Sequence, residues 1–137
     1  MKKKKMKAEP IISTKDTRFR SILTSYLRRF SKFWHPIKLV KDRARIARGM
    51  YQCTTCSKIV GPKDIKIDHI EPVVAITGFT NWEDLVNRLF CEENGLQAIC
   101  SVCHEIKTKE ENRQRKSWKK EKAVLSYYKR KDEKNSE

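Results

Sequence analysis

The sequence Cys53-Thr54-Thr55-Cys56 begins a pattern that Cys100-Ser101-Val102-Cys103 completes. Each stretch is a Cys-x-x-Cys unit, which turns two sulfur atoms toward one point, and two such units form a tetrahedral shell of four thiolates. This shell suits zinc best among the common metals, and it leaves no open coordination position. The pattern therefore predicts a structural zinc site whose binding energy contributes to folding.

Two other interpretations of the cysteine pairs stay open: a redox-active Cys-x-x-Cys, or two reduced and buried pairs. A redox unit normally lies in the strand-helix context of a thioredoxin-like pattern, which these flanking sequences do not have. The fifth cysteine, Cys91, lies outside both units. We expect Cys91 to be an ordinary, partly buried residue.

Composition limits the class of protein. The chain has 137 residues, of which 38% are hydrophobic and 36% are charged, so one compact domain with a small core and a stabilising metal is expected. The net charge of +15 predicts a polyanionic partner. The sequence has neither a bilayer-spanning run of about 20 apolar residues nor an apolar stretch after its basic start. We therefore expect a cytoplasmic protein without a membrane partner, where thiols stay reduced.

The chain divides into four regions of different composition, and its class is expected to be α+β. Residues 1–15 are expected to form a disordered basic tail. Residues 16–50 are expected to form basic amphipathic helices, over 17–34 and then up to Gly49, with a break at Pro36. Residues 51–114 form the predicted zinc-containing domain, with a helical insertion at 71–93. Residues 115–137 are expected to be a charged C-terminal helix or tail.

Short elements are predicted inside the zinc-containing domain. Residues 58–60 and 65–67 have the pattern of two short strands, and the turn residues 61–64 join them as a hairpin. In the insertion, Thr80 and Glu83 form a candidate capping box for an amphipathic helix.

Three residues beside the cysteine pairs can carry chemistry. A zinc ion shared by both pairs would hold His104, directly after Cys103, near the strand that ends in Asp68 and His69. A carboxylate with one imidazole makes an incomplete shell, which is typical of a catalytic metal, so Asp68 and His104 are the candidate ligands. The His69 side chain should point to the other face of the strand, where an imidazole can take a proton from water. Taken singly, Asp68 and His69 could cap a turn, and His104 could merely orient a zinc ligand.

The order of these motifs resembles that of the HNH endonucleases. The matching residues are Asp68-His69-Ile70, then Gly95-Leu96-Gln97-Ala98-Ile99-Cys100-Ser101-Val102-Cys103-His104-Glu105-Ile106-Lys107-Thr108, with Cys53-x-x-Cys56 upstream. The resemblance covers roughly Tyr51 to Glu110. It is closest to the small free-standing HNH proteins encoded in tailed-phage genomes, several of which are homing endonucleases. A phage origin would imply the cytoplasm of the host.

The resemblance implies a ββα-metal fold with a treble-clef-like, four-cysteine zinc site and basic helices at both ends. It implies that Asp68 and His104 bind one divalent metal, Mg²⁺ or Mn²⁺, with nickel and zinc as further candidates. It also implies that His69 activates the attacking water, and that hydrolysis leaves a 5′-phosphate and a 3′-hydroxyl.

One position departs from the family pattern. The family usually has an asparagine immediately before the Leu-Gln pair, where this chain has Gly95, with Asn94 one residue earlier. Either Asn94 takes over that role, or a backbone carbonyl of this loop orients the second nitrogen of His69.

The leading hypothesis is a metal-dependent endonuclease that hydrolyses double-stranded DNA, by a nick or a double-strand break, without a small-molecule cofactor. RNA or branched DNA fits the same residues. The rival hypothesis is a non-catalytic, zinc-containing accessory protein that binds nucleic acid. Under both hypotheses, basic side chains are expected to contact phosphates. The candidates are Arg28, Arg29, Lys41, Arg43, Arg45, Arg48, Lys107, Arg113, Arg115 and Lys116.

Overall fold

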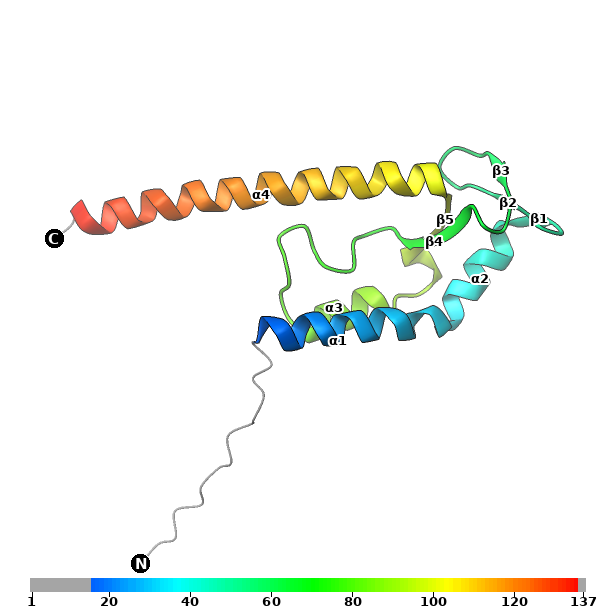
Figure 1. Ribbon diagram of the computed structural model, residues 1–137, viewed down its shortest axis with the longest axis horizontal. Helices are drawn as coiled ribbons and strands as arrows, with labels where there is room; N and C mark the ends of the chain where they lie inside the picture. Colours follow the sequence, from blue (N-terminus) through cyan, green and yellow to red (C-terminus); the bar gives the residue numbers. More distant parts are fainter. Residues whose placement is uncertain (1–15, 136–137) are drawn as a thin grey trace, which may run out of the picture. The chain divides into compact units, whose positions relative to one another are not determined.

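A computed structural model describes the backbone of residues 16–135 and the side chains of residues 16–133 (Figure 1). The predicted tail at 1–15 lies outside the described residues. The chain forms two compact units, divided between Phe33 and Trp34. The described parts are a mixture of helices and small sheets, as the α+β prediction requires.

The first unit contains a helix, α1 (Thr17–Phe30), followed by a short 3₁₀ turn, η1 (Ser31–Phe33). The helix begins at Asp16 because its side chain accepts a hydrogen bond, 2.8 Å long, from the backbone N–H of Arg18. Arg28 and Arg29 lie in the last turn, where positive charge interacts favourably with the helix dipole.

The second unit begins with α2 (His35–Ala44), whose first turn contains Pro36. Proline is tolerated there because its missing N–H has no partner within the helix. The prediction that this helix continues to Gly49 is wrong, because Arg45–Ala47 form the strand β1 instead. Gly49 has φ +73° in the turn to β2 (Met50–Gln52), so its conformational freedom serves a hairpin rather than a helix end.

The first sheet has the order β1-β2-β3, with β3 (Ile59–Val60) antiparallel to β2. The chain between β2 and β3 carries the first cysteine pair. Ser57, with φ 59°, follows this pair and reverses the chain direction. The N–H of Cys53 donates to the carbonyl of Lys58, which closes the loop.

The second sheet pairs β4 (Ile65–His69) with β5 (Leu96–Cys100) in antiparallel register, from Ile65 opposite Cys100 to His69 opposite Leu96. The predicted hairpin between 58–60 and 65–67 is therefore wrong: β3 pairs with β2, and β4 pairs with β5. Burial explains the choice, because β5 is buried along nearly its whole length and offers β4 an apolar partner.

Between the two strands of this sheet the chain forms α3 (Trp82–Leu89) and the 3₁₀ turn η2 (Glu93–Gly95). The side chain of Asn81 caps α3 by accepting from the N–H of Asp84, so the cap lies one residue beyond the predicted Thr80. Leu85 and Leu89 of α3 are each only 2% exposed.

The final helix, α4 (Ser101–Asn135), starts directly at the end of β5 and continues for 35 residues, so residues 101–114 and 115–135 belong to one helix (Figure 1). Its first residue, Ser101, donates from its N–H to the carbonyl of Asp64, 2.8 Å away. This bond fixes the start of α4 against the turn that precedes β4. None of the described helices is both long and apolar enough to cross a lipid bilayer.

Two small apolar clusters hold the second unit together. One consists of Val40 from α2, Ile65 from β4, and Leu96 and Ala98 from β5. The other consists of Cys53, Ile99 and Cys100, with Val60 and Cys103 packed against it. Both clusters use β5, so this strand anchors the side chains described next.

Candidate active site and metal centre

The four cysteines of the two Cys-x-x-Cys units lie together, and their sulfur atoms are all within 4.8 Å of one another. The predicted convergence of Cys53, Cys56, Cys100 and Cys103 is confirmed. The Sγ atoms of Cys56 and Cys100 are 3.8 Å apart. A tetrahedral zinc site with Zn–S bonds of about 2.3 Å has S–S edges of about 3.8 Å, so the distance between Cys56 and Cys100 matches one such edge.

The pKa values of two thiols in this cluster are shifted in opposite directions. Burial opposes ionisation of Cys53, but hydrogen bonds from the backbone of Cys56, Cys100 and Thr55 outweigh it and lower the pKa to about 6. Contact with Cys100 and partial burial raise the pKa of Cys103 to about 12. Four thiolates at one point repel one another unless a cation lies between them, so the donor set fits a metal such as zinc.

Cys91 lies outside this cluster, as predicted, and its side chain is partly buried. Burial raises the pKa of its thiol. Its sulfur lies against Gly95, where an added Cβ atom would be 2.7 Å from Sγ. A side chain at position 95 would collide with Cys91, so glycine lets the loop at 93–95 pack closely against this cysteine.

Asp68 and His104 face one another across the junction between β4 and α4. Oδ1 of Asp68 lies 3.9 Å from Nε2 of His104. Oδ2 is buried and accepts no hydrogen bond within the described part of the chain, but it forms an ion pair with the ammonium of Lys107, 2.8 Å away. Two ligand atoms on one small divalent cation lie roughly 3 to 4 Å apart, so this carboxylate and imidazole fit such a cation.

His69 points to a different element from Asp68, in agreement with the predicted alternation along the strand. Its Nε2 lies 2.9 Å from the carbonyl oxygen of Leu89 at the end of α3. Because a carbonyl can only accept, Nε2 carries the proton in the neutral ring, and Nδ1 keeps its lone pair. The sequence predicted that either Asn94 or a backbone carbonyl of its loop orients His69. In the structure the orienting carbonyl is that of Leu89.

Asn94 itself is exposed within η2. The neighbouring carbonyl of Gly95 accepts a hydrogen bond from the N–H of Ile70, 2.9 Å away, which extends the contact between the ends of β4 and β5. The loop therefore contributes to the site through its backbone.

Lys107, one of the residues expected to contact phosphates, is partly buried beside Asp68 and His69. Its Nζ is 2.8 Å from Oδ2 of Asp68 and donates to the carbonyl of His69, 2.8 Å away, and to Glu111, 2.6 Å away. Burial alone would lower the pKa of Lys107, but the contacts with Asp68 and Glu111 outweigh it and raise the pKa. Sequence reasoning missed Glu111, although its spacing of four residues from Lys107 on a helix was a signal.

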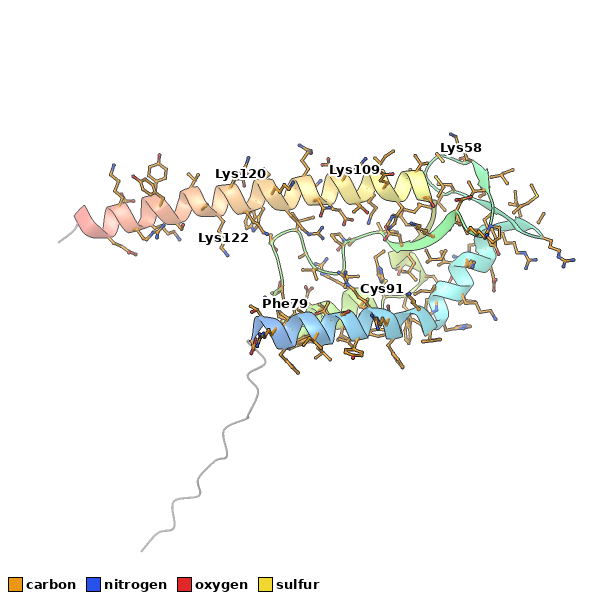
Figure 2. The ribbon with its side chains drawn as sticks, viewed as in Figure 1. Lys58, Phe79, Cys91, Lys109, Lys120 and Lys122 are labelled. Atoms are coloured by element: carbon orange, nitrogen blue, oxygen red, sulfur yellow. The ribbon has the colours of Figure 1, made fainter. Side chains whose placement is uncertain are left out.

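Several other basic residues predicted to bind phosphates have partners within the chain. Arg43 pairs with Glu93, Arg113 with Glu110, and Arg115 donates to the carbonyl of Val74. The ammonium of Lys41 lies 5.7 Å from the centre of the Tyr51 ring. The remaining candidates, Arg28, Arg29, Arg45, Arg48 and Lys116, are exposed. Figure 2 shows Lys109 and Lys120 on one side of α4 and Lys122 on the other.

Comparison of the chain with protein-family models, with curated proteins and with solved structures finds no match.

Proposed function

We propose that this protein is a metal-dependent endonuclease of the HNH type, which hydrolyses phosphodiester bonds of double-stranded DNA. The observation that carries the proposal is the approach of Asp68 Oδ1 to His104 Nε2, at 3.9 Å, on a strand whose next residue is His69. The order of β4, β5 and α4 supports the ββα-metal interpretation, because that fold needs two antiparallel strands followed by a helix.

Each proposed role follows from one contact. Asp68 and His104 hold the divalent metal, Mg²⁺ or Mn²⁺, which when bound stabilises negative charge on the phosphate and on the leaving oxygen. His69 accepts a proton from water at Nδ1, while the carbonyl of Leu89 holds the ring through Nε2. The four-cysteine site has a structural role: it joins the loop before β3 to the start of α4 and so keeps His104 beside β4.

A non-catalytic protein that binds nucleic acid remains the second candidate, and Lys107 favours it. The ammonium of Lys107 lies 2.8 Å from Asp68, so this carboxylate has an ionic partner without any metal. The net charge of +15 and the cysteine cluster fit either candidate.

The His69→Ala variant tests the proposed base. We expect cleavage of supercoiled plasmid with Mg²⁺ or Mn²⁺ to fall at least about 100-fold, because general-base catalysis contributes factors of that size. Zinc content and DNA affinity should stay near those of the natural chain. The matched control is His35→Ala, which removes an exposed imidazole at the start of α2 and should leave the rate unchanged.

Two results would count against the proposal. Undiminished cleavage by pure His69→Ala protein excludes His69 as the base. Plasmid that stays intact with the natural chain under every divalent metal tested favours the non-catalytic candidate.

A further inference from the structure

Lys107 is enclosed by oxygen atoms of the proposed active site. An ammonium group has three N–H donors, and Nζ of Lys107 lies within 2.8 Å of three oxygens: Oδ2 of Asp68, the carbonyl of His69 and Oε1 of Glu111. The Lys107 side chain is 24% exposed, and that of Glu111 is 19% exposed. Oxygen atoms of the protein therefore surround the ammonium, and a phosphate would have to displace one of them to bind Lys107.

These contacts join two elements at the point where the chemistry is proposed. Asp68 and His69 are the last residues of β4, and Lys107 and Glu111 lie one turn apart on α4. Because the ammonium lies against Oδ2, the other oxygen of Asp68, Oδ1, is the one turned toward His104. Lys107 thus sets the orientation of the carboxylate and also the position of the His69 backbone.

We propose that Lys107, held by Glu111, is a positioning residue of this site, which fixes Asp68 as a one-oxygen metal ligand and fixes the backbone of His69. The inference rests on the proposed function. It has an electrostatic consequence that simple packing would not have. The charge of Lys107 repels a divalent cation at Asp68 and His104, and the charge of Glu111 offsets part of that repulsion.

The two substitutions Lys107→Met and Glu111→Gln should therefore change cation affinity in opposite directions. We expect Lys107→Met to bind Mn²⁺ at least about threefold more tightly, because a repelling charge is removed, and Glu111→Gln to bind it at least about threefold more weakly. Mn²⁺ affinity is measured without DNA, by electron paramagnetic resonance of the free ion. An Asp68→Ala variant identifies the part of the binding that belongs to this site.

Cleavage should respond differently from affinity. At saturating Mn²⁺, the single-turnover rate of Lys107→Met should fall at least about tenfold, because Asp68 and His69 lose their common anchor. Lys107→Arg keeps the positive charge, so its Mn²⁺ affinity should equal that of the natural chain. The matched control is Lys109→Met: Lys109 pairs with Glu105 at the same spacing, but its side chain is 75% exposed. Both the Mn²⁺ affinity and the single-turnover rate of Lys109→Met should lie within about twofold of those of the natural chain.

The outcomes separate the alternatives. Tighter Mn²⁺ binding with slower cleavage by Lys107→Met, and weaker binding by Glu111→Gln, supports the inference. Weaker binding by both variants, or a change in DNA affinity alone, overturns it. If Lys107→Met does not fold, the direction of the change in Mn²⁺ affinity of Glu111→Gln decides.

The natural chain separates this inference from the proposed function. If it binds Mn²⁺ through Asp68 but does not cleave DNA, the proposed function fails while the two affinity changes still decide the role of Lys107. If it binds no Mn²⁺ through Asp68, both proposals fail.

Discussion

The last carbonyl groups of a helix have no partner inside it, and in α3 one of them becomes part of the proposed active site. Leu89, the final residue of α3, accepts from His69. This hydrogen bond satisfies the helix end and also selects the ring nitrogen that can act as a base. A backbone carbonyl does this without a particular side chain, so the absence of asparagine at position 95 does not remove the orienting contact.

Gly95 leads to a prediction about packing at the residue scale. An added Cβ atom would lie 2.7 Å from Sγ of Cys91, closer than real Cβ contacts, and 3.0 Å from its Cβ, which is tighter than most of them. Gly95→Ala should therefore lower the free energy of unfolding by about 1–3 kcal/mol, as overpacking usually does. Urea denaturation checks this value.

A second substitution identifies the cause of that destabilisation. In a Cys91→Ala background the sulfur is gone, so Gly95→Ala should cost measurably less than in the natural chain. An equal cost in both backgrounds would show that Cys91 is not the obstacle.

At the scale of elements, the cysteine cluster connects three parts of the chain that are separate in the sequence. The loop between β2 and β3 supplies two thiols, the end of β5 supplies the third, and the first turn of α4 supplies the fourth. Because His104 directly follows Cys103, a metal bound by the four cysteines would also fix the position of one proposed catalytic ligand.

Removing one cysteine of the cluster tests this dependence. We expect the natural chain to bind about one zinc ion, and Cys56→Ala to lose most of it and unfold at a temperature at least about 10 °C lower. The control is Cys91→Ala, a cysteine outside the cluster, which should keep its zinc. Zinc content is measured by atomic absorption and unfolding by circular dichroism. Equal zinc content in the natural chain and Cys56→Ala would contradict the assignment of this ligand.

At the scale of the whole molecule, the long helix α4 carries positive charge on two opposite sides. Residues three, four, seven or eleven apart lie on one side of a helix. Lys109, Lys116 and Lys120 therefore share one side, opposite the side that carries Lys107 and Glu111. Lys122 and Lys129 continue the side of Lys107 and Glu111 along the helix, and Figure 2 places Lys122 opposite Lys120.

These two sets of lysines should contribute unequally to DNA binding. DNA bound at the proposed active site would lie nearer to the side of Lys107, so we expect Lys122 and Lys129 to contact its phosphates. Replacing both by glutamine should reduce the slope of log binding constant against log salt by about 0.9 for each phosphate that is no longer neutralised. The same change at Lys116 and Lys120 removes equal charge and should have a smaller effect. Fluorescence anisotropy at several salt concentrations measures both slopes, and equal reductions would contradict the proposed direction of approach.

Spacing along the chain was enough to predict the metal cluster, because a Cys-x-x-Cys unit is a local geometry that needs only a partner unit. The same holds for the alternation that separates Asp68 from His69. The hairpin predicted at 58–67 failed because strand pairing depends on which partner is most buried, and the buried strand, 96–100, is distant in sequence. The helix predicted up to Gly49 failed because a glycine with positive φ suits a hairpin turn as well as a helix end.

What the amino-acid order determined by itself is the set of groups: four thiols in two pairs, a carboxylate and two imidazoles at fixed offsets, and an excess of cations. What only the tertiary structure decided is which group faces which. It turned Lys107 inward to Asp68 and Glu111, and it gave His69 the carbonyl of Leu89. The physical reason is that a buried charge or N–H must find a partner wherever packing offers one, and packing brings together residues whose separation along the chain carries no signal.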